Sequence, residues 1–203
     1  MLYFVGGRSN YTYSLLFGIN AASGEEFQSQ VPASLQQDVR AMIYSLTVVA
    51  GVVYVDVSVP PPADTTPAVA RKGTAYLDTY NGSNGAFLAR YEQTPGTSFI
   101  YSRYPLHLIQ NLIVFGMMNA GSSVDYNLVA FNTTTKTRAW FVHIRYPDYA
   151  ADFLQVANDV IYLNVGTHLY AYSLAGKLLH DYTIPVSNID QGPAYGPFIS
   201  IVA

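Results

Sequence analysis

The stretch from Asp159 to Tyr182 reads DVIYLNVGTHLYAYSLAGKLLHDY and predicts three β-strands separated by two turns. Two apolar runs, residues 160–163 (VIYL) and 169–172 (LYAY), are rich in β-branched and aromatic side chains. Such residues favour strands over helices. Ser173 and Gly176 bracket a turn before a third run at residues 177–182. The stretch therefore predicts an antiparallel meander.

The same phrase occurs four times along the chain. Its first strand is expected at residues 1–4, 52–55, 112–115 and 160–163. Its second strand is expected at residues 16–19, 77–80, 128–131 and 169–172. Its third strand is expected at residues 26–27, 86–91, 139–142 and 177–182. Each second strand runs into a turn that opens with Asn20, Asn81, Asn132 or Ser173. An Asn side chain hydrogen-bonds its own backbone in turns, and glycine accepts positive φ, so hairpins are expected there.

A further apolar run precedes three of the first strands, at residues 42–46, 106–109 and 153–156. The N-terminal repeat has no such run, and residues 198–202 (FISIV) supply one at the other end of the chain. Repeats near 50 residues made of short strands are typical of β-propeller blades. We therefore expect an all-β fold, a propeller of about four four-stranded antiparallel blades, closed by pairing of the C-terminal strand with the N-terminal blade.

One domain over residues 1–203 is expected, and its approximate blades are residues 198–203 plus 1–31, 42–93, 105–144 and 153–184. The alternative is half of a larger ring, completed by a second copy of the chain. The protein would be a monomer in the first case and a dimer in the second.

The phrases resemble the repeats of the PQQ-like, quinoprotein-type propellers, which are related to WD40-like repeats. Residues 159–163 with 169–172 and 176–179 match best, followed by 128–132 with Trp140. The resemblance implies the fold. Enzymes of this family hold their quinone with Ca²⁺ ligands and often a vicinal disulfide, whereas this chain has no Cys and no acidic cluster at calcium-ligand spacing. The expectation is therefore a propeller without cofactor or metal.

The composition excludes several kinds of protein. Only 11% of the residues are charged, the net charge is −3 and the sequence pI is about 5.7, so the broad basic surface needed for nucleic-acid binding is missing. The most apolar stretch, residues 41–55, is about 15 residues long, whereas a spanning helix needs about 20. It is interpreted as two strands around Ala50 and Gly51.

The candidate binding surface is the face that the longer loops share. Propeller geometry places residues 6–14, 56–73, 116–126 and 164–168 on it, together with the blade-to-blade segments 30–40, 93–104, 145–152 and 185–197. Arginine and tyrosine, which are common in binding hot spots, recur there. The candidate ligand-binding residues are Arg8, Tyr11, Arg40, Arg103, Tyr104, Arg145, Tyr146, Asp148 and His168. Solvated loops or salt bridges between blades would explain the same residues.

Arg103-Tyr104-Pro105 and Arg145-Tyr146-Pro147 repeat one motif at two blade junctions, and a structural role is the preferred interpretation. The four histidines never occur at metal-ligand spacing, and His107 and His143 are interpreted as hydrogen-bonded core residues. No Ser lies in a G-x-S-x-G motif. No catalytic residue is therefore predicted.

Few Lys residues and many Tyr, Thr, Asn and Ser residues favour an extracellular or cell-surface protein. The preferred function is a non-catalytic binding or scaffolding module, part of a larger protein, that binds a protein or a small polar ligand through the loop face. The alternative is a propeller enzyme, a quinoprotein dehydrogenase relative or a hydrolase, with its site at the central channel.

Overall fold

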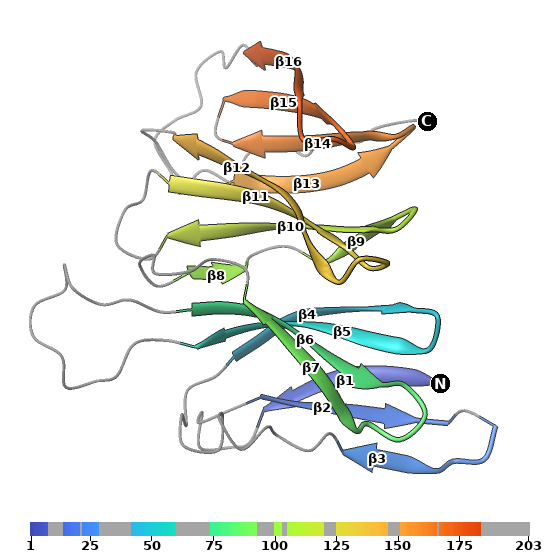
Figure 1. Ribbon diagram of the computed structural model, residues 1–203. Helices are drawn as coiled ribbons and strands as arrows, with labels where there is room; N and C mark the ends of the chain where they lie inside the picture. Colours follow the sequence, from blue (N-terminus) through green and yellow to red (C-terminus); the bar gives the residue numbers. More distant parts are fainter. Residues whose placement is uncertain are drawn as a thin grey trace, which may run out of the picture. The chain divides into compact units, whose positions relative to one another are not determined.

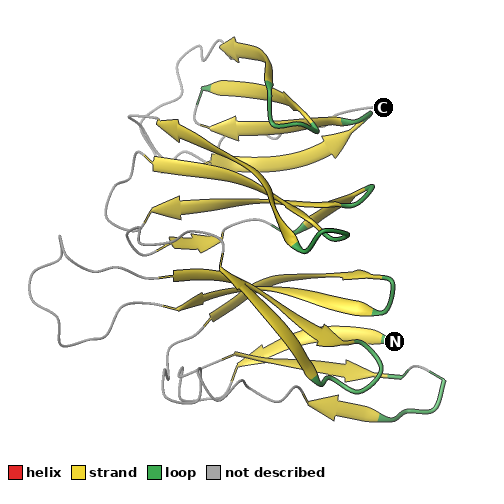
Figure 2. Cartoon of the chain, in the orientation of Figure 1, coloured by secondary structure: helices red, strands yellow, loops and turns green. Residues whose placement is uncertain are grey.

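The computed structural model consists of β-strands joined by turns and loops (Figures 1 and 2). It describes residues 1–7, 14–20, 22–28, 42–59, 74–92, 100–102, 105–119, 125–145, 151–165 and 167–183. The described residues contain no α-helix, and thus none that could cross a membrane. The chain divides into two compact units, residues 1–106 with 119–121 and residues 107–118 with 122–203. The expected single domain over residues 1–203 stays a prediction.

The first unit contains two antiparallel sheets. Sheet 1 has the order β1 (Leu2–Gly7), β2 (Ser14–Ile19), β3 (Glu26–Gln28), and sheet 2 the order β4 (Met42–Val49), β5 (Val52–Val59), β6 (Thr74–Asn81), β7 (Phe87–Glu92). The short strand β8 (Ile100–Ser102) lies close to β4, β5 and β6.

The second unit repeats this design. Sheet 3 pairs β9 (His107–Ile109), β10 (Leu112–Asn119), β11 (Asp125–Asn132) and β12 (Thr137–Arg145) in that order. Sheet 4 pairs β13 (Ala151–Ala157), β14 (Val160–Val165), β15 (His168–Ser173) and β16 (Leu178–Thr183). The expected four-stranded antiparallel sheets are confirmed here and in sheet 2. The fourth strand of sheet 1 was expected at residues 198–202, which lie outside the described residues, so closure stays a prediction.

Turn chemistry sets the hairpins, as expected. The side-chain oxygens of Asn20, Asn81 and Asn132 each accept hydrogen bonds from backbone N–H groups two or three residues ahead. Gly24, Gly85 and Gly176 close three of these turns with positive φ, where a side chain would be strained. The first hairpin of sheet 2 turns at Ala50 and Gly51, both with positive φ, as the type I′ geometry requires.

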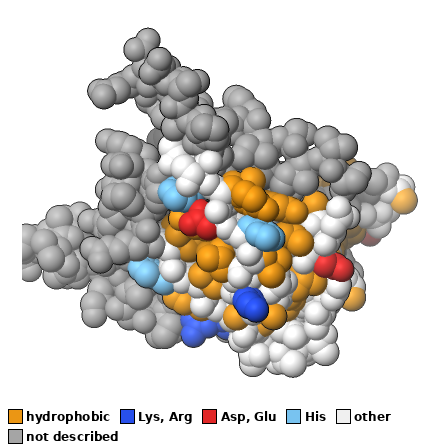
Figure 3. Space-filling view, turned by 90° about the horizontal axis from the view of Figure 1, so that it is seen from above, with side chains coloured by type: hydrophobic (Ala, Val, Ile, Leu, Met, Phe, Trp, Pro, Cys, Tyr) orange, Lys and Arg blue, Asp and Glu red, His pale blue; other side chains and the backbone are white. Residues whose placement is uncertain are grey.

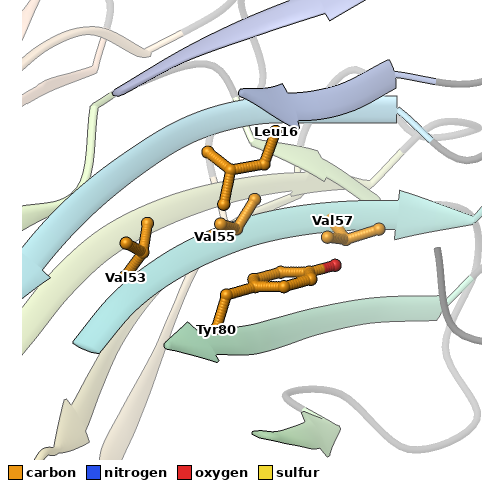
Figure 4. Close-up of a cluster of buried hydrophobic side chains, with 5 residues drawn as sticks. All are labelled: Leu16, Val53, Val55, Val57 and Tyr80. Atoms are coloured by element: carbon orange, nitrogen blue, oxygen red, sulfur yellow. The ribbon is translucent and has the colours of Figure 1, made fainter. Parts of the chain in front are cut away.

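The core of the first unit lies between its two sheets. In the first unit, Leu16 of sheet 1 packs against Val53, Val55, Val57 and Tyr80 of sheet 2 (Figure 4). The valines share one face of β5 because side chains alternate along a strand. In the second unit, Ile113, Phe115, Leu128, Ile161 and Leu163 are fully buried. Burying one such side chain contributes roughly 1.5–3 kcal/mol, so these junctions are the main source of stability.

Candidate functional site

Two of the nine predicted site residues lie within the described part of the chain. His168 is the first residue of β15, and Arg145 is the last residue of β12, where its backbone pairs with Asp125. The other seven lie outside the described residues: Arg8, Tyr11, Arg40, Arg103, Tyr104, Tyr146 and Asp148. Their role stays a prediction.

The predicted loop boundaries need correction. Residues 56–59 belong to strand β5, where Asp56 and Ser58 are buried. Only residues 166 and 167 separate β14 from β15, so His168 is a strand residue and lies opposite Val165. The strands are longer than their apolar runs because backbone pairing continues through polar positions such as Asp56 and Asn164. The loop face is correspondingly smaller.

His168 forms the centre of a polar and aromatic cluster on β15 and β16. Its Nδ1 lies 2.8 Å from Oδ1 of Asp181, and both side chains are solvent-accessible, Asp181 to 43%. The two residues are diagonal neighbours, because His168 lies opposite Thr183 and Asp181 opposite Tyr170. The Asn164 side chain donates a hydrogen bond to the His168 carbonyl at 3.0 Å and thereby secures this end of the hairpin.

This geometry assigns the proton on the imidazole. An ionised carboxylate only accepts hydrogen bonds, so Nδ1 of His168 donates to Asp181. The neutral ring then carries its lone pair on Nε2, which is a hydrogen-bond acceptor. Protonation of the ring would turn the pair into a salt bridge, weakened by its exposure to solvent.

Aromatic rings extend the cluster along β15. The Tyr170 ring stacks on His168 with a centroid separation of 5.6 Å and an interplanar angle of 11°, and the Tyr172 ring follows at 6.3 Å from Tyr170. Burial raises the pKa of Tyr172 to about 12, and the nearby Tyr170 and Asp181 add to the shift. Tyr172 therefore remains a neutral phenol at physiological pH. The cluster thus combines the aromatic rings of Tyr170 and Tyr172 with the polar, solvent-accessible side chains of His168 and Asp181.

The equivalent positions of sheet 2 hold a different arrangement. Counting from the turns, Tyr76, Asp78 and Arg90 correspond to His168, Tyr170 and Asp181. Asp78 is fully buried and accepts two hydrogen bonds of 2.7 Å from Arg90, whose guanidinium also lies 4.3 Å from the centre of the Tyr76 ring.

Burial raises the pKa of Asp78, while the bond to Arg90 opposes that shift. The pKa of Tyr80 is raised by burial and by the charge of Asp78. The paired Asp78 and Arg90 neutralise each other inside the fold, so their role is structural.

Two other histidines, His107 and His143, differ in their exposure to solvent. His107 on β9 is half-buried, which lowers its pKa, and a hydrogen bond to the backbone of Leu154 partly opposes the shift. His143 was expected in the core, but it is exposed and bonds to Asn127 at 2.9 Å. It is exposed because β12 is an edge strand. Among the described strands of its unit, β12 pairs only with β11.

The sequence reasoning missed Tyr170 and Asp181. The sequence signal that could have found Tyr170 is the alternation of side chains along the strand at residues 168–173. This alternation places His168, Tyr170 and Tyr172 on one face of β15. A calcium-bound quinone would require a set of oxygen donors. Among the residues that the structure describes, no three His, Cys, Asp or Glu side chains form a cluster that could hold a metal ion.

Comparison with known proteins bears on the fold. No family model and no curated protein sequence matches the chain. Among solved structures, a europium-containing methanol dehydrogenase superimposes with a TM-score of 0.59 at 10% identity, over 89% of this chain and 39% of the other. The fold is a β-propeller. The chain spans about two fifths of the methanol dehydrogenase.

Two further structures are similar. A neuraminidase-like protein from A/bat/Guatemala/164/2009 gives a TM-score of 0.50 at 11% identity, over 89% of this chain and 54% of the other. BamB from Moraxella catarrhalis gives 0.42 at 15% identity, over 86% and 59%. At such low identity these likenesses concern architecture alone, because one propeller fold hosts unrelated activities.

Proposed function

We propose that this propeller is a non-catalytic binding module that recognises a partner through the His168 cluster of sheet 4. The observation that carries the proposal is the solvent-accessible His168–Asp181 pair with Tyr170 stacked on it. Tyrosine supplies a large, rigid contact area at a small cost in side-chain entropy. The imidazole and the carboxylate add a donor and acceptors of fixed geometry.

The ligand is expected to be a protein segment or a small polar molecule. The Asp181 carboxylate favours a cation or an N–H donor, and a tyrosine ring favours an apolar or cationic group. A peptide with Lys or Arg next to an aromatic or aliphatic residue satisfies both. The low content of charged residues, 11%, supports the further proposal of an extracellular setting.

The competing function is hydrolysis. A histidine whose Nδ1 donates to a carboxylate is the base-and-orienter half of a catalytic triad. Catalysis would in addition need a nucleophile within reach of Nε2. The exposure of the His168–Asp181 pair to solvent argues for binding, because charge stabilisation in catalysis works best where water is excluded.

Phage-displayed peptides selected on the purified protein would test the proposal. Selected peptides should bind with micromolar affinity in calorimetry, and Tyr170→Ala and Asp181→Asn should each weaken them at least tenfold. Lys136→Ala, an exposed turn residue of sheet 3, is the matched control and should leave the affinity unchanged.

Two results would overturn the proposal. Tight binding of PQQ together with Ca²⁺ would assign a quinoprotein role instead. Hydrolysis of p-nitrophenyl acetate that disappears in His168→Gln, with the fold intact by circular dichroism, would assign a catalytic one.

A further inference from the structure

One leucine recurs at the same position in the second strand of each repeat. These residues are Leu16, Leu77, Leu128 and Leu169. The first three are completely buried, at 0% exposure, whereas Leu169 is only half-buried. Sheet 4 therefore has an incompletely covered face where the other sheets have a covered one.

A second row shows the same pattern at the other end of the chain. The equivalent first-strand residues are Leu2, Val53, Ile113 and Ile161. The last three are at 0% exposure, whereas Leu2 is 63% exposed. The two rows lie on opposite faces of each sheet: Leu77 lies opposite Asp56, and Val53, three residues before Asp56, points to the other face.

The first unit demonstrates how the two kinds of face fit together. Leu16, from the leucine row of sheet 1, packs into the cluster of Val53, Val55, Val57 and Tyr80 on sheet 2 (Figure 4). A leucine-row face thus packs on the Val53-type face of the following sheet. Among the residues that the structure describes, one face of each kind has incompletely covered members: the leucine-row face of sheet 4, with half-buried Leu169, and the Leu2 face of sheet 1.

The open face of sheet 4 is apolar in character. Tyr162, Leu169 and Tyr182 lie on it, and Tyr182 is 50% exposed. Figure 3, which views the molecule from above Figure 1, shows hydrophobic side chains gathered in a patch with histidines among them. On sheet 1, half-buried Phe17 and Ile19 accompany Leu2.

The junction of sheets 3 and 4 has a further contact, between a ring and a turn, whose two halves have counterparts on these faces. Within the second unit, Trp140 of sheet 3 donates from Nε1 to the Leu174 carbonyl at 2.8 Å, and its ring packs on Gly176 in the turn of sheet 4. On sheet 4 the position of Trp140 is taken by His180, which lies opposite Ala171 as Trp140 lies opposite Ala130.

His180 is exposed, and its ring lies 5.4 Å from that of Tyr182. The turn of sheet 1 that corresponds to Gly176 contains Gly24, with φ +73° and open space where a Cβ would be. Within the described part of the chain, the exposed His180 ring of sheet 4 has no turn packed against it, and the Gly24 turn of sheet 1 has no ring packed on it.

We propose that these two faces are the halves of an interface between two copies of this chain. The leucine-row face of sheet 4 of one copy packs on the Leu2 face of sheet 1 of the other, with His180 over the Gly24 turn. A second, identical junction related by a two-fold axis covers the remaining two faces. A second copy fits better than an unrelated partner because both complementary faces belong to the same chain. Faces of the same two kinds pack on each other within the first unit, where Leu16 meets the Val53 cluster.

Light scattering coupled to size exclusion gives the first test. The chain has a mass of 22.3 kDa, and the expected species has twice that mass. Leu2→Asp and Leu169→Asp should each yield monomers. Mixing the two variants should restore a dimer, because Leu169 of the first variant and Leu2 of the second still form one intact junction. Failure of either variant to fold would appear in circular dichroism and would not be rescued by mixing.

Disulfide trapping gives the second test, on a chain that has no cysteine of its own. Ser23→Cys and His180→Cys, made as separate variants and mixed under mild oxidation, should form a covalent heterodimer. Thr134→Cys, in an exposed turn of sheet 3, is the matched control and should not couple to His180→Cys.

Three outcomes would overturn the proposal. The first is a wild-type mass of one copy, or of more than two. The second is the absence of coupling between the mixed variants. The third is a cross-linked monomer from the Ser23→Cys/His180→Cys double variant, which would show that the ring closes within one chain.

Discussion

Sheets 2 and 4 are built from the same repeat, but their environments differ. In sheet 2 the side chains on both faces of the central strands are buried, including Tyr54, Leu77 and the charged Asp78. In sheet 4 the equivalent Tyr162, Leu169 and Tyr170 are only half-buried. Repeat proteins gain most of their stability at the interfaces between neighbouring repeats. Equivalent residues therefore stabilise the fold in one sheet and are available for recognition in the other.

The two side-chain pairs, Asp78–Arg90 and His168–Asp181, make the contrast clearest. In the pair on β6 and β7, Asp78 is fully buried and Arg90 is 19% exposed, whereas in the pair on β15 and β16 His168 is 27% and Asp181 43% exposed. Removing one partner of a buried pair leaves an uncompensated charge, while removing one partner of an exposed pair costs little. Sheet 2 and sheet 4 should thus respond very differently to the same kinds of substitution.

The largest difference is expected from neutralising the two carboxylates. Asp78→Asn should lower the free energy of unfolding by about 3 kcal/mol, because Arg90, which is 19% exposed, keeps its charge after losing its buried partner. Asp181→Asn should change it by less than about 1 kcal/mol. Urea denaturation followed by circular dichroism measures both. Equal losses in the two variants would contradict the contrast.

The next difference concerns the leucine row. Leu77→Ala should cost about 2–5 kcal/mol, because it opens a cavity in a fully buried site. Leu169→Ala should cost about 1 kcal/mol or less, since solvent already reaches this side chain. Both variants should be unfolded at the same low protein concentration, so that self-association does not add to the stability of Leu169. A similar loss in both would show that the sheet 4 face is covered within one chain.

A smaller difference is expected for two glycines with nearly the same φ. Gly176→Ala and Gly24→Ala should each lose roughly 1–2 kcal/mol, because an L-residue is strained at positive φ. Gly176→Ala should lose more, since its Cβ would lie 2.7 Å from the Trp140 ring. Trp140 is the only tryptophan, so its fluorescence spectrum should shift in Gly176→Ala and stay unchanged in Gly24→Ala.

The smallest effect is expected from His107. Burial lowers its pKa in the folded protein below the ordinary value of 6.5. Above pH 6.5 the ring is neutral in both states; below it, the unfolded chain takes up a proton more readily, so stability falls as the pH falls. His107→Gln should reduce the loss of stability between pH 7 and pH 5. A loss identical to that of the wild type would show that other groups cause it.

Much of the fold was predictable because it depends on local rules. Alternating and continuous apolar runs located the strands of sheets 2, 3 and 4, and Asn20, Asn81 and Asn132 located turns. The candidate site was less predictable. The sequence singled out His168. Its contact with Asp181, however, joins diagonal neighbours on the adjacent strands β15 and β16 and therefore depends on the register of these strands. A β-bulge between Ala171 and Tyr172 changes that register, and no residue of the sequence marks it plainly.

The sequence by itself determined that the chain forms repeated antiparallel sheets with tight Asn- and Gly-containing turns. These features follow from backbone preferences within a few residues of each position. Only the tertiary structure decided which members of each repeat are covered. Leu77 and Leu169 have the same residue type and the same place in the repeat, and they differ because burial depends on whether another sheet packs against that face. The tertiary structure also decided that Asp78 is buried, whereas His168 and Asp181 stay solvent-accessible.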